Sequence, residues 1–129
     1  MVVGLSAAVL QGAPVVTQDV DLWFKDLSNP QFQDALRSVK GIYVPPFGAN
    51  PPLLGGNGLE LLDIVTTVHG LKSFNEEYAG SKKLKLGRIT VRVLPLARIL
   101  KSKRSLKRKK DLAVIPILED VLKTLRSKK

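Results

Sequence analysis

Two aspartates separated by a single residue, Asp19 and Asp21, stand in a stretch where apolar residues alternate with other types. This period of two, over residues 17–24, predicts a strand with both aspartates on one face. At a rise of ~3.3 Å per residue, their Cα atoms lie roughly 6–7 Å apart. Two carboxylates at this spacing repel each other unless a cation lies between them, and their hard oxygen atoms suit Mg²⁺ or Mn²⁺. The stretch therefore predicts a divalent-metal site; the alternative is a solvated sheet face.

A third acid, Asp63, interrupts the apolar run of residues 59–66. We expect this run to be a largely buried strand, where an unpaired carboxylate is costly and needs a partner or a metal. Three acids from two strands match what a metal-assisted phosphoryl or nucleotidyl transfer requires. We therefore predict that Asp63 lies on a strand next to that of Asp21, with its carboxylate converging on the other two. The alternative is that Asp63 stands near a strand end, in water.

The residues around these acids follow a recognisable order. Residues 3–22 contain a small-residue turn, a short helical stretch, the segment Gly12-Ala13-Pro14-Val15-Val16-Thr17, and then Asp19-Val20-Asp21-Leu22. The order continues with Leu62-Asp63-Ile64-Val65-Thr66, Gly70-Leu71, Phe74-x-Glu76-Glu77, Ser102-Lys103-Arg104 and Lys110-Asp111-Leu112-Ala113. Across nearly the whole chain, this resembles the nucleotidyltransferase superfamily, and within it a small prokaryotic branch with toxin-like and abortive-infection-type members.

This resemblance implies a mixed sheet flanked by helices that binds Mg²⁺ and a nucleoside triphosphate. It implies metal binding by Asp19, Asp21 and Asp63, with Asp63 also activating an acceptor hydroxyl on an RNA end, such as that of a tRNA, or on a protein. Gly4 and Ser6 match the turn that holds the triphosphate, where a helix N-terminus favours anions.

Two departures from the family pattern keep other readings open. Leu5 stands where the family usually has a second Gly or a Ser, and the helix that usually precedes the first strand is missing. The alternatives are therefore a nucleotide-binding module that has lost catalysis, or a basic nucleic-acid-binding or partner-binding protein. In the second case the partner would be an antitoxin-like protein or a second copy of the chain, covering a sheet face.

The net charge of +10 is divided unevenly along the chain. The first 80 residues hold 4 Lys and Arg against 8 Asp and Glu, so the other 49 hold 17 against 3. An acidic half and a basic half in one domain suggest a cation site that faces an anionic ligand. Within the basic half, Lys103 extends the apolar stripe of a predicted helix. We expect its amine to reach either water or an anion, such as a phosphate or Asp63.

The basic run of residues 107–110 is either an RNA- or DNA-backbone contact or a solvated turn. No aromatic residues are interleaved with it, so base stacking is not expected. His69 is the only histidine and there is no cysteine, so neither zinc binding nor disulfides are expected. We read His69 as a loop residue.

The 129 residues suit one α/β (α+β) domain, with a basic helical part from about residue 95. No apolar stretch approaches the ~18 residues of a membrane span, so we expect a cytoplasmic protein without membrane contact. The predicted helices are 6–10, 30–40, 73–80, 95–106 and a last segment divided by Pro116. We also predict an irregular loop over residues 42–58 and a hairpin around Gly87.

Overall fold

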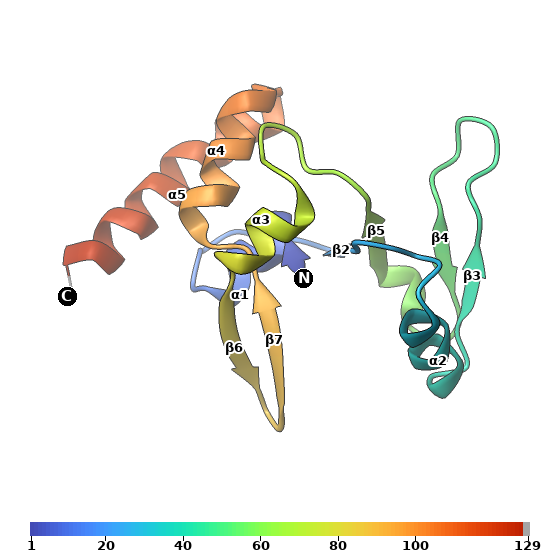
Figure 1. Ribbon diagram of the computed structural model, residues 1–129. Coiled ribbons are helices and arrows are strands. Elements are labelled where there is room, and N and C mark those ends of the chain that lie inside the picture. Colours follow the sequence, from blue (N-terminus) through green and yellow to red (C-terminus); the bar gives the residue numbers. More distant parts are fainter. Residues whose placement is uncertain (128–129) are drawn as a thin grey trace.

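The computed structural model describes residues 1–127 as a mixed α and β fold, which confirms the expected class (Figure 1). In chain order its elements are β1 (Val2–Val3), α1 (Gly4–Leu10), β2 (Val20–Trp23), α2 (Pro30–Ser38), β3 (Ile42–Val44), β4 (Leu53–Gly55), a short 3₁₀ turn (Leu59–Leu61), β5 (Leu62–Val65), α3 (Phe74–Ala79), β6 (Lys82–Leu86), β7 (Ile89–Val93), α4 (Leu96–Leu106) and α5 (Lys109–Ser127). No helix within residues 1–127 is long and apolar enough to cross a membrane.

The main sheet has the strand order β5-β2-β1-β7-β6. Strand β1 pairs antiparallel with β2 and parallel with β7, and β2 pairs parallel with β5. The buried core lies between the short central strand β1, helix α1 and helices α4 and α5 (Figure 1). Its fully buried members include Ala7, Ala8, Val93, Leu94, Ile99 and Leu118. This core fixes α4 and α5 beside the strands that carry the aspartates.

Local sequence signals place several elements as predicted. Asn29 caps α2 by accepting a hydrogen bond from the backbone N–H of Gln31, and Pro30 is the first helical residue. Ser73 accepts from the N–H of Glu76 at the start of α3. Strands β6 and β7 form the expected hairpin, with Gly87 at its tip.

Residues 42–58 are not irregular throughout, which corrects our prediction in part: residues 45–52 and 56–58 lie outside the strands, whereas residues 42–44 and 53–55 pair. Strands β3 and β4 form a two-stranded hairpin that is not hydrogen-bonded to the main sheet; it lies near α2, and β4 lies close to the edge strand β5 (Figure 1). Leu54 is buried, whereas Ile42 and Leu53 are exposed, so the hairpin buries one face. Proline cannot donate to a strand ladder, and the prolines flank these three-residue strands instead of interrupting them.

Pro116 does not divide the last helix, which is a second correction. Helix α5 runs continuously from Lys109 to Ser127 with Pro116 inside it. A proline in a helix interior costs about 3 kcal/mol. The apolar stripe that α5 presents to the core offsets this cost through packing. Its members are Val114, Ile115, Leu118, Val121 and Leu122.

Strand β5 is shorter and more exposed to solvent than predicted. It begins at Leu62, after the 3₁₀ turn, and it is one of the two edge strands of the sheet. Its burial is intermediate, and Asp63 on it is exposed. The expectation of a largely buried strand was therefore wrong, because β5 has a neighbouring strand on one side only.

Candidate functional site

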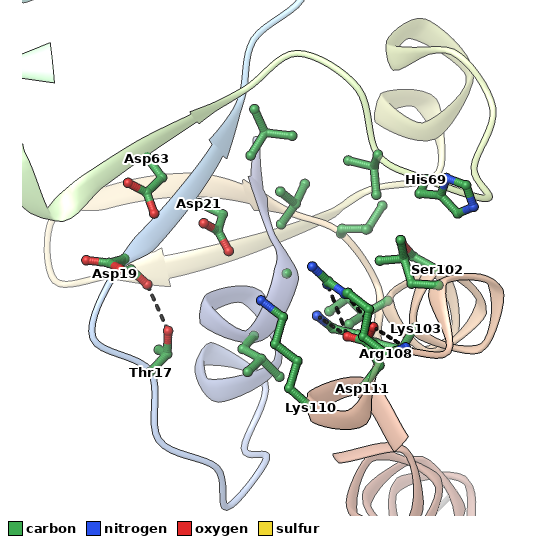
Figure 2. A pocket seen from close by; sticks show the side chains of 18 of the residues that line it. Thr17, Asp19, Asp21, Asp63, His69, Ser102, Lys103, Arg108, Lys110 and Asp111 are labelled. Carbon is green, nitrogen blue, oxygen red and sulfur yellow. Dashed lines mark hydrogen bonds and ion pairs between the residues drawn. The ribbon is translucent and has the colours of Figure 1, made fainter. Parts of the chain in front are cut away.

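The three aspartates lie along one wall of a cavity of about 520 Å³ (Figure 2). Parallel pairing of β2 with β5 sets Asp21 directly opposite Asp63. Asp19 precedes β2 by one residue, and the hydroxyl of Thr17 donates to its backbone carbonyl at 3.0 Å. The structure thus places the three predicted acids on one cavity wall, with Asp63 on the strand next to that of Asp21 as predicted, although within residues 1–127 the three do not form a cluster that could hold a metal by itself.

The pKa values of two of these carboxylates, Asp21 and Asp63, are raised. Burial is the main cause that raises the pKa of Asp21 above its ordinary value; the negative charges of Asp63 and Asp19 raise it further, against the opposing effect of Lys103 and Lys110. Partial loss of hydration, and then the charge of Asp19, raise the pKa of Asp63, although its side chain is exposed. The ionised forms of Asp21 and Asp63 are therefore disfavoured, and a bound cation would relieve the repulsion.

The acids suit a metal ion that is shared with another ligand. Within residues 1–127, no three His, Cys, Asp or Glu side chains lie close enough together to hold a metal by themselves. Protein sites for Mg²⁺ commonly use one or two carboxylates together with phosphate oxygens of a bound substrate. Carboxylates that are spread along a cavity wall fit a site of this kind, in which the substrate supplies the remaining ligands of the metal.

The turn at Gly4 presses against Asp21. Gly4 has a positive φ of 65°, and a Cβ atom built on it would lie 2.5 Å from Oδ2 of Asp21. Gly4 and Leu5 line the cavity, whereas Ser6 does not. The buried hydroxyl of Ser6 donates to the carbonyl of Val3 at 2.8 Å and accepts from the N–H of Asp21 at 3.1 Å. Ser6 therefore holds Asp21 in place, and Gly4 leaves it room.

The opposite wall of the cavity is basic. Lys103, Arg108 and Lys110 line it, and Figure 2 shows the ammonium group of Lys110 pointing towards Asp21. The Lys103 side chain is 14% exposed, and its Nζ lies 3.3 Å from Oδ1 of the fully buried Asp111. We expected Lys103 to reach either water or an anion such as a phosphate or Asp63. Within the protein, its ion-pair partner is Asp111 instead.

Asp111 also binds Arg108. The Arg108 Nε donates to Oδ2 at 2.7 Å, and the backbone N–H of Arg108 donates to the same oxygen at 3.1 Å. The hydrogen bonds from the Arg108 side chain are the main cause that lowers the pKa of Asp111 to about 2. Asp111 is thus ionised at neutral pH and neutralised by its two cationic neighbours.

Sequence reasoning missed Arg108, Lys110 and Asp111 as site residues. One signal was present in the sequence. Arg108 precedes the first residue of α5, and an acid three residues after such a cap position commonly accepts a hydrogen bond from the cap's backbone N–H, as Asp111 does here. His69 lies in the loop after β5, which confirms that it is a loop residue; that it lines the cavity was not predicted.

Neither the scan against protein-family models nor the search of curated proteins found a match to this chain.

Proposed function

We propose that the chain is a metal-dependent nucleotidyltransferase, which moves a nucleoside monophosphate from a triphosphate to an acceptor hydroxyl. The observation that carries this proposal is the cavity itself, with Asp19, Asp21 and Asp63 on one wall and three cations on the other. A carboxylate wall suits a divalent cation, and a cationic wall suits phosphates. A nucleoside triphosphate with its Mg²⁺ or Mn²⁺ carries charges of both signs and so could face both walls.

In this proposal, Asp19 and Asp21 hold the metal, which would neutralise negative charge on the reacting phosphate when bound. The acceptor oxygen forms a bond to the α-phosphorus as the bond to the bridging oxygen breaks, and pyrophosphate leaves. Asp63 orients the acceptor hydroxyl and takes its proton. The exposure of Asp63 on an edge strand supports this role, because an acceptor must enter from solvent while Asp21 lies deeper.

The remaining roles belong to the phosphate side. Gly4 gives the phosphates close access beside Asp21, and Lys103 offsets the charge that develops on the leaving pyrophosphate. Ser6 acts through Asp21, because its hydroxyl accepts a hydrogen bond from the backbone N–H of Asp21. The acceptor is an RNA end, including that of a tRNA, or a protein hydroxyl.

A nucleotide-binding module without catalysis is the second candidate. The observation that favours it is that Leu5, a bulky apolar residue, lines the cavity beside Gly4. In that case the protein would hold a triphosphate and signal through a partner, an antitoxin-like protein or a second copy, without transfer.

The test is transfer of a labelled nucleotide from each of the four triphosphates, with Mg²⁺ or Mn²⁺, to total RNA and to protein fractions. We expect the parent to label one fraction. Asp63→Asn should keep Mg²⁺–nucleotide affinity within roughly tenfold, about 1.4 kcal/mol, because it is not the main metal ligand. Its transfer rate should fall on the order of 10²-fold or more as a lost general base. Binding by the parent without any labelling would favour the second candidate, and no nucleotide binding would overturn both.

A further inference from the structure

The basic run of residues 107–110 is divided by the fold into two pairs. Arg108 and Lys110 line the cavity, whereas Lys107 and Lys109 do not. The cause is local: Lys107, the residue after α4, has a left-handed φ of 55°, so the chain turns sharply before α5 begins at Lys109. Neighbouring residues on the first turn of α5 then point in different directions. A run that looks uniform in sequence therefore has two faces.

Asp111 joins Lys103 and Arg108 into one unit. It has no exposed surface, and its two carboxylate oxygens contact Lys103 from α4 and Arg108 from the turn. The Arg108 side chain remains 46% exposed, so part of its guanidinium is open to a ligand. A buried carboxylate with two cationic partners restricts where both cations can lie. This contact also ties the turn before α5 to the face of α4.

The basic wall keeps a positive balance after these internal pairs are counted. Lys103, Arg108 and Lys110 carry three positive charges, and Asp111 carries one negative charge, which leaves a net charge of +2. Lys110 has no carboxylate within ion-pair distance among residues 1–127. A planar guanidinium beside ammonium groups matches the oxygens of a phosphate chain.

We propose that Arg108 and Lys110, together with Lys103, bind the phosphate chain of the ligand, that Asp111 is the positioning residue for Lys103 and Arg108, and that Lys107 and Lys109 take no part. That this chain belongs to a nucleoside triphosphate rests on the proposed function. The anion site does not depend on catalysis.

The test uses inorganic tripolyphosphate, titrated into the full chain by calorimetry, with MgCl₂ and separately with EDTA. Lys110→Gln and Lys109→Gln are a matched pair, since both remove one positive charge from the first turn of α5. We expect Lys110→Gln to weaken binding about tenfold, as for the loss of one charge-assisted hydrogen bond. Lys109→Gln should stay within about twofold of the parent. Equal loss in both variants, or none in either, would overturn the division of the run.

Asp111→Asn separates positioning from simple charge. If the carboxylate only added negative charge near the anion, its removal would tighten tripolyphosphate binding; a positioning residue predicts weaker binding, by threefold to tenfold. Arg108→Lys keeps the charge but removes the planar fork, so it should also weaken binding. Tighter binding by Asp111→Asn together with parental binding by Arg108→Lys would overturn the positioning role. If Asp111→Asn does not fold, parental binding by Arg108→Lys alone would overturn it.

The outcomes also separate this inference from the proposed function. A parent that binds tripolyphosphate through Lys110 but transfers no nucleotide would contradict the enzyme and leave the anion site standing. If the parent transfers nucleotide but Lys110→Gln binds tripolyphosphate as tightly as the parent does, only the anion site would be contradicted.

Discussion

A Cβ atom on Gly4 would lie 2.5 Å from the Oδ2 atom of Asp21, a separation at which one of the two must move. Gly4 also has a φ of 65°, a region that costs an L-residue about 1–2 kcal/mol. Gly4→Ala should therefore lower the free energy of unfolding by at least about 1 kcal/mol, and it should displace Asp21. Urea unfolding measures the first effect, and the rise in melting temperature on adding Mn²⁺ measures the second.

Gly48→Ala is the control for this substitution. Gly48 has a similar φ of 58°, but nothing lies within 4 Å of a Cβ atom there. It should share the loss of stability and keep the full response to Mn²⁺. An equal metal response in both alanine variants would show that the contact with Asp21 does not matter to the site.

Asp21→Asn should stabilise the metal-free protein at neutral pH. The pKa of Asp21 is raised in the fold, so the stability linked to its neutral form is present below the unfolded pKa of about 3.9 and is lost as pH rises through the folded pKa. The variant avoids this loss, so its advantage should appear above about pH 4 and grow to less than about 1 kcal/mol, since the group is partly exposed. Thermal unfolding between pH 3 and 7 measures it.

The same variant should lose most of the stabilisation that millimolar Mg²⁺ or Mn²⁺ gives the parent. Asp120→Asn, an exposed acid on α5, should keep it. A parent melting temperature that does not change with metal would count against the aspartate site.

Asp111→Ala should destabilise the protein by about 2–3 kcal/mol, because two cations lose a fully buried partner. The pKa of Asp111 is lowered to about 2, mainly by Arg108, so its contribution is present above about pH 4 and is lost as pH falls through 2. The difference between parent and variant should shrink over that range in urea unfolding. Glu119→Ala, which breaks an exposed pair with Arg104, should cost less than 1 kcal/mol. Similar losses in both variants would contradict the account.

RNA binding would involve the outward-facing pair. If the acceptor is RNA, replacing Lys107 and Lys109 with Gln should reduce the slope of log affinity against log salt by about 1.4, as for two single-strand phosphate contacts. The affinity of this double variant for tripolyphosphate should equal that of the parent. An unchanged slope would identify these lysines as a solvated turn.

Local signals in the sequence predicted much of this fold. The caps at Asn29 and Ser73 and the turn at Gly87 act through neighbouring backbone groups, so a short window contains all the information. The period of two around Asp19 and Asp21 likewise predicted a shared face. The pairing of Asp21 with Asp63 followed from treating both as strand residues in one sheet.

What could not be predicted depends on contacts distant in sequence. Pro116 stays helical because α5 packs on the core, and this packing outweighs a local preference. Asp63 is exposed because β5 is an edge strand, which strand order alone decides. The inward direction of Arg108 and Lys110 follows from the left-handed turn at Lys107, a conformation that a lysine rarely adopts.

The measurement that tests the central claim most directly is the anomalous diffraction of crystals soaked with Mn²⁺ and a non-hydrolysable nucleoside triphosphate. We predict an anomalous peak beside the carboxylates of Asp19, Asp21 and Asp63, with the phosphate chain extending from it towards Lys103, Arg108 and Lys110. Crystals of Asp21→Asn should lack the peak under the same conditions. A fully occupied nucleotide elsewhere on the protein, or a cavity that takes up neither Mn²⁺ nor nucleotide at millimolar concentration, would contradict it.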